Sequence, residues 1–525
     1  MALDGIWDEI RGMEPLIRCL PCDAWRTNQE DNELVLTRPL RDSDLNILHK
    51  YTPRIHYFTH ISGGIHIDIY RSLSLLHTHV PLLPNLRYLN WRASSTPGVY
   101  TYLPLFLCPK LDNLELQLDL VQPEQLAILV ALPTDVPNIT RLRLDILADG
   151  MPVKSGLAEI SGLSEVLGLW GKLHKITITD ITRDAFVAAA LLPELVELAI
   201  TDAAFRWLLP SAAGASNLWP VSSPDAERKP YFSLKNLSVT SSRSGASSST
   251  ITSFLELFQG MNLVSLSVKA AASHCAIDQL TNFFQCVRAQ CNTRTLKRLD
   301  LRFQTADDFS LSTLLPLLDF PALDVVVIDL PCNIALSEQE ACKIALAWPD
   351  LRILRLCPMG QRMRPLAAMT KLLALIPFAR HCPKLTELSI VFDASHPGTR
   401  RLLCDEPHRY KGVRNKSLAV LHVGASPISH KEFVAVFLQD IFPNLSSVTV
   451  FHLDERRVRA DVVSWTYIDM VLLPTMAMAR RSEREWLKSG GDNDEDREDR
   501  ERQQQRWFTD VECMELAFQV LSGLV

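Results

Sequence analysis

One short pattern recurs along most of this chain and constrains its fold more than any other feature. Its clearest copy, Cys108–Leu116, reads Cys-Pro-Lys-Leu-Asp-Asn-Leu-Glu-Leu, and Cys382–Ile390 repeats it as Cys-Pro-Lys-Leu-Thr-Glu-Leu-Ser-Ile. Weaker copies bring the total to 14, spaced by about 30 residues, and a period of this length is typical of a repeat architecture. The first apolar anchors of the copies are Ile55, Leu86, Leu111, Ile139, Leu173, Leu195, Leu234, Leu263, Leu296, Leu323, Leu351, Leu385, Leu418 and Leu445.

The spacing within one copy predicts a short strand followed by a helix. Leu114 and Leu116 alternate with polar residues, as a strand with one buried face requires. A strand this short buries that face only when neighbouring copies stack beside it in a parallel sheet, and each parallel neighbour needs a crossover of a dozen or more residues. We therefore expect an α/β leucine-rich-repeat solenoid, a curved parallel sheet with strands on the concave side and helices on the convex side.

The repeats divide the chain into three predicted segments. Residues 1–50 form an N-terminal cap, and residues 51–475 form the solenoid of about 14 repeats. Residues 476–525 form a C-terminal cap helix, interrupted by a charged insertion at 488–506 that lacks apolar residues and is expected to be disordered.

Several helices are expected from local signals. Apolar residues at helical spacing predict a helix over Leu3–Met13, and acidic residues in a first turn predict another from Asp42 to Lys50. Pro123–Leu132 is expected to be a crossover helix. Capping boxes that begin at Ser337 and at Ser429 predict two more helix starts.

Composition limits the classes of partner and the compartment. The formal net charge of −6 over 525 residues gives no global argument for binding nucleic acid or a membrane. The first nine residues have no basic and no apolar region, so we expect no signal peptide, and no apolar run approaches the 18 residues of a transmembrane helix. Twelve scattered cysteines fit free thiols in a reducing compartment, so we expect a cytoplasmic or nuclear protein, acting as a monomer.

No motif in the sequence indicates catalysis, a cofactor or a metal. The chain contains no phosphate-binding glycine loop, no Gly-x-Ser-x-Gly and no His-Glu-x-x-His. Cys19 and Cys22 form a single Cys-x-x-Cys, but a structural zinc site needs four ligands and no second pair follows. Cys108 and Cys382 occupy equivalent repeat positions, which favours packing. We therefore expect a protein that is not an enzyme.

What remains is a recognition surface on the predicted concave face. Most positions that alternate with the core leucines are polar, among them Arg141, Arg143 and Lys175. Three apolar residues on adjacent predicted strands depart from this rule, and arginines surround them. An apolar patch rimmed by arginines is typical of a protein-binding site, so we expect a protein partner there, unless other segments cover the patch. The six candidate residues are Arg298, Arg302, Val325, Val327, Ile353 and Arg355.

The chain also resembles the large family of fungal F-box/leucine-rich-repeat-like proteins. The residues that carry the resemblance are Leu16–Trp25, Leu36–Leu40, Tyr51–Ile55 and the repeats that follow. The resemblance implies a substrate-recruiting subunit of an SCF ubiquitin ligase, with the linker and cullin subunits as further partners. No Leu-Pro-x-Glu helix opening precedes Leu3, so we expect the F-box itself to be absent from this chain. The alternative is a repeat interaction protein with no ubiquitin-ligase link.

Overall fold

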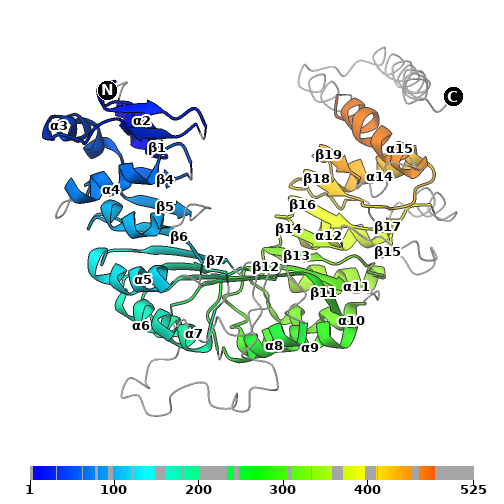
Figure 1. The fold of residues 1–525 in the computed structure, drawn as a ribbon. Coiled ribbons are helices and arrows are strands. Elements are labelled where there is room, and N and C mark those ends of the chain that lie inside the picture. Colours follow the sequence, from blue (N-terminus) through cyan, green and yellow to red (C-terminus); the bar gives the residue numbers. More distant parts are fainter. Residues whose placement is uncertain are drawn as a thin grey trace, which may run out of the picture. The chain divides into compact units, whose positions relative to one another are not determined.

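A computed structural model describes most of the chain. The described residues are 4–30, 32–61, 63–76, 81–92, 98–119, 123–147, 161–179, 181–201, 233–241, 248–258, 260–305, 310–332, 334–357, 370–395, 410, 412–450 and 460–478. The chain divides into two compact units, the first comprising Met1–Ala246 and Ser253–Leu263 and the second Ser247–Thr252 and Val264–Val525. Within each unit the strands form a parallel sheet with the helices along one side (Figure 1), which confirms the α/β solenoid.

In the first unit the strands of the main sheet pair with one another in chain order, with β2 and β3 left out. The order is β1, β4, β5, β6, β7, β8, β9 and β10, all parallel. These strands are β1 (Glu9–Arg11), β4 (Tyr57–His60), β5 (Tyr88–Arg92), β6 (Asn113–Asp119), β7 (Arg141–Leu147), β8 (Lys175–Ile178), β9 (Glu197–Ile200) and β10 (Asn236–Ser241). Between β1 and β4 in the sequence, β2 (Trp25–Thr27) and β3 (Leu34–Leu36) form a small antiparallel pair of their own.

Helical crossovers separate these strands, as parallel pairing requires. Among the described residues they are α2 (Glu14–Ile17), α3 (Asp42–Tyr51), η1 (Thr52–Arg54), α4 (Ile67–Leu76), η2 (Val99–Phe106), α5 (Pro123–Asp135), α6 (Ser161–Leu169) and α7 (Arg183–Ala190), and α1 (Asp4–Asp8) precedes β1. Helix α8 (Ser248–Glu256) contains residues of both units. The helices expected at Asp42–Lys50 and Pro123–Leu132 are therefore confirmed.

The second unit repeats this plan. Its parallel strands are β11 (Ser265–Cys275), β12 (Arg298–Thr305), β13 (Val325–Asp329), β14 (Ile353–Leu356), β16 (Glu387–Ile390), β18 (Val420–His422) and β19 (Ser447–Thr449). A minor two-stranded sheet pairs β15 (Thr370–Lys371) with β17 (Phe392–Asp393). Its helices are α9 (Ile277–Gln290), α10 (Leu311–Leu314), η4 (Leu315–Asp319), α11 (Glu338–Ala347), η6 (Leu372–Ala374), α12 (Leu375–His381), α14 (Lys431–Ile441), α15 (Ala460–Tyr467) and η8 (Ile468–Leu472).

The repeat anchors make up the core of both units. Every anchor named from the sequence is buried, with Leu445 the most exposed at 3%. A strand follows each one, from β4 after Ile55 to β19 after Leu445. Burying a leucine side chain stabilises a fold by about 1.5–3 kcal/mol, so the stacked anchors supply a continuous driving force along each sheet.

The residue three positions before an anchor ties one repeat to the preceding one. Trp170 and Trp348 each donate from Nε1 to a main-chain carbonyl of the preceding repeat at 3.2 Å, that of Val136 and that of Leu317. Cys108 Sγ contacts the carbonyl oxygen of Leu86 at 3.1 Å. These positions are therefore buried and hydrogen-bonded.

Two expectations from the sequence are wrong. The helix predicted over Leu3–Met13 ends at Asp8, and Glu9–Arg11 instead forms β1, the first strand of the sheet. The capping box that begins at Ser337 is present, but Ser429 does not cap α14, because the N-cap is His430 with φ +55°. Ser429 Oγ instead donates to the carbonyl of Ser395 at 3.0 Å.

The C-terminal expectations are only partly within the described residues. Helix α15 and the π-helical turn η8 follow the last strand, β19. The charged insertion at 488–506 and the rest of the predicted cap from 479 onward lie outside the described residues.

Candidate functional site

The six residues predicted as a partner site lie together on three neighbouring strands of the second unit. We call the face of each sheet that carries the residues alternating with the buried leucines its open face. On it, Arg298, Val325 and Ile353 are register partners across β12, β13 and β14. Val327 pairs with Arg355 in the next row, and Arg302 pairs with Asp329 beyond it. Neighbouring strands are about 4.8 Å apart, so the six side chains form one continuous patch, the arginine–valine patch.

The apolar members of the arginine–valine patch are half-buried. Val325, Val327 and Ile353 are neither fully covered nor fully exposed, whereas Val326 and Leu354, which alternate with them, are buried in the core. The patch therefore presents apolar surface on the side of the sheet away from the leucine core, and contact with a partner would remove that surface from water.

Two arginines of the patch are held by neighbouring carboxylates. Arg302 pairs with Asp329 at 2.7 Å, and Arg355 Nε donates to Glu387 Oε1 on β16. The hydrogen bond that Arg355 donates to Glu387 raises the pKa of Arg355 above its ordinary value. Arg298, by contrast, is exposed and makes no ion pair with any other described residue. Arg298 is thus the arginine of the patch that has no ion pair among the described residues.

The polar contacts continue from Arg355 across the open face. Glu387 Oε1 also lies within hydrogen-bond distance of His422 Nε2, at 3.1 Å. The other ring nitrogen of His422, Nδ1, contacts Thr449 Oγ1. Burial alone would raise the pKa of Glu387, but the hydrogen bond from Arg355, with smaller contributions from His422, lowers it. Ser389 lies in register between Arg355 and His422, is fully buried, and has no hydrogen-bond partner for Oγ among the described residues.

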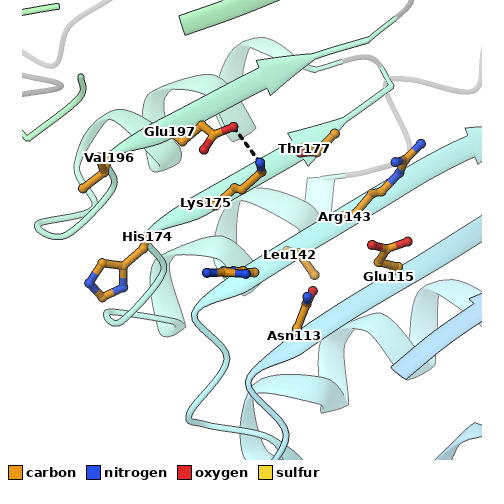
Figure 2. Close-up of a pocket in the computed structure, with 10 residues that line it drawn as sticks. Asn113, Glu115, Leu142, Arg143, His174, Lys175, Thr177, Val196 and Glu197 are labelled. Carbon is orange, nitrogen blue, oxygen red and sulfur yellow. Dashed lines mark ion pairs between the residues drawn. The ribbon is translucent and has the colours of Figure 1, made fainter. Parts of the chain in front are cut away.

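The first unit has a pocket of about 570 Å³ on its open face, which the sequence alone did not single out. Figure 2 shows side chains from β6, β7, β8 and β9 around it, with the ion pair between Lys175 and Glu197. The signal that identifies it is positional, since seven of its lining residues are polar and recur at the same two positions of consecutive repeats, and His174 stands one position before Lys175. The seven are Asn113, Glu115, Arg141, Arg143, Lys175, Thr177 and Glu197.

Among the described residues, no three His, Cys, Asp or Glu side chains gather where they would bind a metal ion. Cys22 is exposed and Cys19 Sγ contacts the carbonyl oxygen of Pro15 at 3.3 Å. Cys108 and Cys382 are buried, and burial raises the pKa of the Cys382 thiol to about 12. In the part of the chain that the structure describes, no helix has the length and apolar character to cross a membrane.

Comparisons with known proteins find likeness only at the level of solved structures. The chain matches no protein-family model, and no curated protein matches it. Among solved structures it is similar to one described as the crystal structure of the Rad7 and Elc1 complex in yeast. The identity is 14%, the match covers 75% of this chain and 86% of that chain, and the TM-score is 0.34.

Proposed function

We propose that this protein is a non-enzymatic protein-recognition scaffold that binds its partner at the arginine–valine patch. The observation that carries the proposal is the register of the patch, which sets half-buried Val325, Val327 and Ile353 beside arginines. Protein interfaces favour apolar anchors with arginine nearby, because the aliphatic surface is desolvated while the guanidinium forms directional bonds to carboxylates. Since Asp329 and Glu387 hold Arg302 and Arg355 in place, less side-chain entropy is lost on binding.

The role of the scaffold is proposed from the family resemblance. On that resemblance the protein recruits substrates to an SCF ubiquitin ligase in the cytoplasm or nucleus. The residues that would carry the link to the ligase are those of the N-terminal segment, Leu16–Trp25 and Leu36–Leu40. The second possibility is an interaction protein with no ubiquitin-ligase partner.

Affinity purification with quantitative mass spectrometry tests both parts of the proposal. Tagged wild-type protein is compared with Val327→Asp, which places a charge among the apolar residues of the patch. Val436→Asp is the matched control, because Val436 is 44% exposed on α14 and lies outside the patch. The proposal expects one or more proteins to be lost with Val327→Asp and kept with Val436→Asp. Equal recovery with all three proteins would contradict it.

The same experiment separates the two roles. Recovery of cullin and its linker subunit with wild-type protein supports the ligase role. Recovery of partners that depend on Val327 without any ligase subunit supports the interaction protein.

A further inference from the structure

The pocket of the first unit contains a cation that the fold does not neutralise. Across β6, β7, β8 and β9, four register partners follow one another: Asn113, Arg141, Lys175 and Glu197. Lys175 pairs with Glu197 at 2.6 Å. Arg141 is exposed, makes no ion pair with any other described residue, and lies between an amide and the like charge of Lys175. Like charges directly opposite each other destabilise a sheet, and a bound anion would relieve this repulsion.

The charged side chains one step further along these strands, Arg143 and Glu115, already have partners within the protein. Arg143 pairs with Asp145 at 3.0 Å, and this hydrogen bond raises the pKa of Arg143. Glu115 accepts a hydrogen bond from Asn90 Nδ2 at 3.1 Å. The anion-binding capacity of the pocket is therefore concentrated at Arg141.

The register series that contains Arg141 continues across β5 and β4, where its members are the tyrosines Tyr88 and Tyr57. Tyr57 and Tyr88 are register partners, and Tyr88 is in turn the partner of Asn113. Their ring centroids are 6.2 Å apart, and Tyr57 is 44% exposed. Strands are spaced by about 4.8 Å, so Tyr88 lies about 10 Å and Tyr57 about 14 Å from Arg141 along the row. An extended peptide advances about 3.3 Å per residue, so these distances correspond to about three and four residues.

We propose that the first unit binds an extended acidic segment of a partner protein. A carboxylate of that segment binds the guanidinium of Arg141, and an apolar side chain three or four residues away packs on Tyr57 and Tyr88. Glu115 and Glu197 also line the pocket, so a monoanionic carboxylate is repelled less than a dianionic phosphate. The site is separate from the arginine–valine patch and does not depend on the function proposed for it.

Selection from a phage-displayed library of random 12-residue peptides, with the full-length protein as bait, tests this site. The site predicts enrichment of peptides in which Asp or Glu stands three or four positions from an aromatic or aliphatic residue. The enriched peptide, made synthetically, is expected to bind Arg141→Gln about tenfold or more weakly than wild type, because a charge-assisted hydrogen bond is lost.

Matched variants separate the binding role of Arg141 from general charge effects. Arg26→Gln removes an exposed arginine on β2, outside the pocket, and is expected to bind the peptide as wild type does. Tyr57→Ala is expected to weaken binding of peptides that carry the apolar residue, and an unchanged melting temperature shows that the variants are folded. Enrichment of peptides without an acidic residue, absence of enrichment, or equal binding by wild type and Arg141→Gln would overturn the proposal.

Discussion

The indole Nε1 of Trp348 donates a hydrogen bond to the main-chain carbonyl oxygen of Leu317 at a distance of 3.2 Å. Trp348 is fully buried, and it stands three residues before the repeat anchor Leu351. Trp170 makes the same contact in the other unit, with Val136. The repeats are thus joined by directional bonds between successive crossovers in addition to apolar packing.

Replacing Trp348 by Phe is expected to lower the melting temperature, because it removes the Nε1–H donor and leaves the carbonyl of Leu317 with only the amide of Phe320, at a cost of about 0.5–1.5 kcal/mol for the lost hydrogen bond. Trp91→Phe is the control, since Trp91 is also fully buried but its Nε1 has no hydrogen-bond partner among the described residues. Thermal unfolding followed by circular dichroism measures both. If Trp91→Phe lowers the melting temperature as much as Trp348→Phe does, the lost side-chain volume alone explains the destabilisation and the hydrogen bond contributes nothing.

Acidification is expected to remove the contribution of Glu387 to stability. Its pKa in the fold lies below the ordinary value of 4.5, so the ionised carboxylate stabilises the fold above that pH. The contribution is lost as the pH falls through the lowered pKa. At pH 7, Glu387→Gln should therefore melt below wild type, and the two melting temperatures should converge toward pH 3. Glu256→Gln, an exposed residue of α8, serves as control, and a difference between wild type and Glu387→Gln that does not shrink as the pH falls from 7 to 3 would contradict the ion-pair account.

The rate at which a cysteine is alkylated is expected to be lower when its side chain is buried. Cys332 and Cys357 are buried with their sulfur atoms 3.7 Å apart, and burial raises the pKa of Cys357. Cys22 is exposed. Under native conditions iodoacetamide should alkylate Cys22 at least about tenfold faster than Cys357, because the thiolate is the reactive form. Peptide mass spectrometry over time gives both rates, and equal rates would show that the fold opens around β13 and β14.

The N-cap of α11 is expected to contribute measurably to stability. Ser337 Oγ accepts from the amide of Glu340 at 3.3 Å, and Glu340 Oε2 accepts from the amide of Ser337 at 2.8 Å. Ser337→Ala should destabilise the protein by about 1 kcal/mol, while Ser337→Thr retains a capping oxygen and should cost less. Thermal unfolding of the two variants distinguishes a lost cap from a general surface effect. If Ser337→Ala and Ser337→Thr lower the melting temperature equally, the cap does not account for the stability.

The sequence predicts the repeated part of the fold well because each copy contains its own signal. Leu111, Leu114 and Leu116 specify a strand and its buried face without reference to any other copy, and both anchors and strands are confirmed. Strand β1 could not be found in this way. Ile6, Trp7, Ile10 and Met13 recur at helical spacing, but parallel pairing with β4 determines that Glu9–Arg11 is extended, and Gly12 with φ +73° follows it.

The candidate sites show the same division between local and tertiary signals. Alternation places Val325, Val327 and Ile353 on one face, and register then brings them beside Arg298. Which arginines are already paired depends on distances across strands, and only the structure distinguishes Arg355, bound to Glu387, from Arg298. Burial of Ser389 likewise results from its tertiary neighbours, since its position in the alternating pattern alone predicts exposure.

The most direct measurement for the proposed interface is the dissociation constant of a recovered partner for wild type, Arg298→Glu and Arg26→Glu. Arg298 makes no ion pair within the described residues, so its reversal alters the arginine–valine patch without breaking an internal contact. Binding at this patch predicts that Arg298→Glu weakens the complex tenfold or more, as expected for about 1.4 kcal/mol or more, while Arg26→Glu leaves it unchanged. Equal dissociation constants for all three proteins would contradict recognition at the patch.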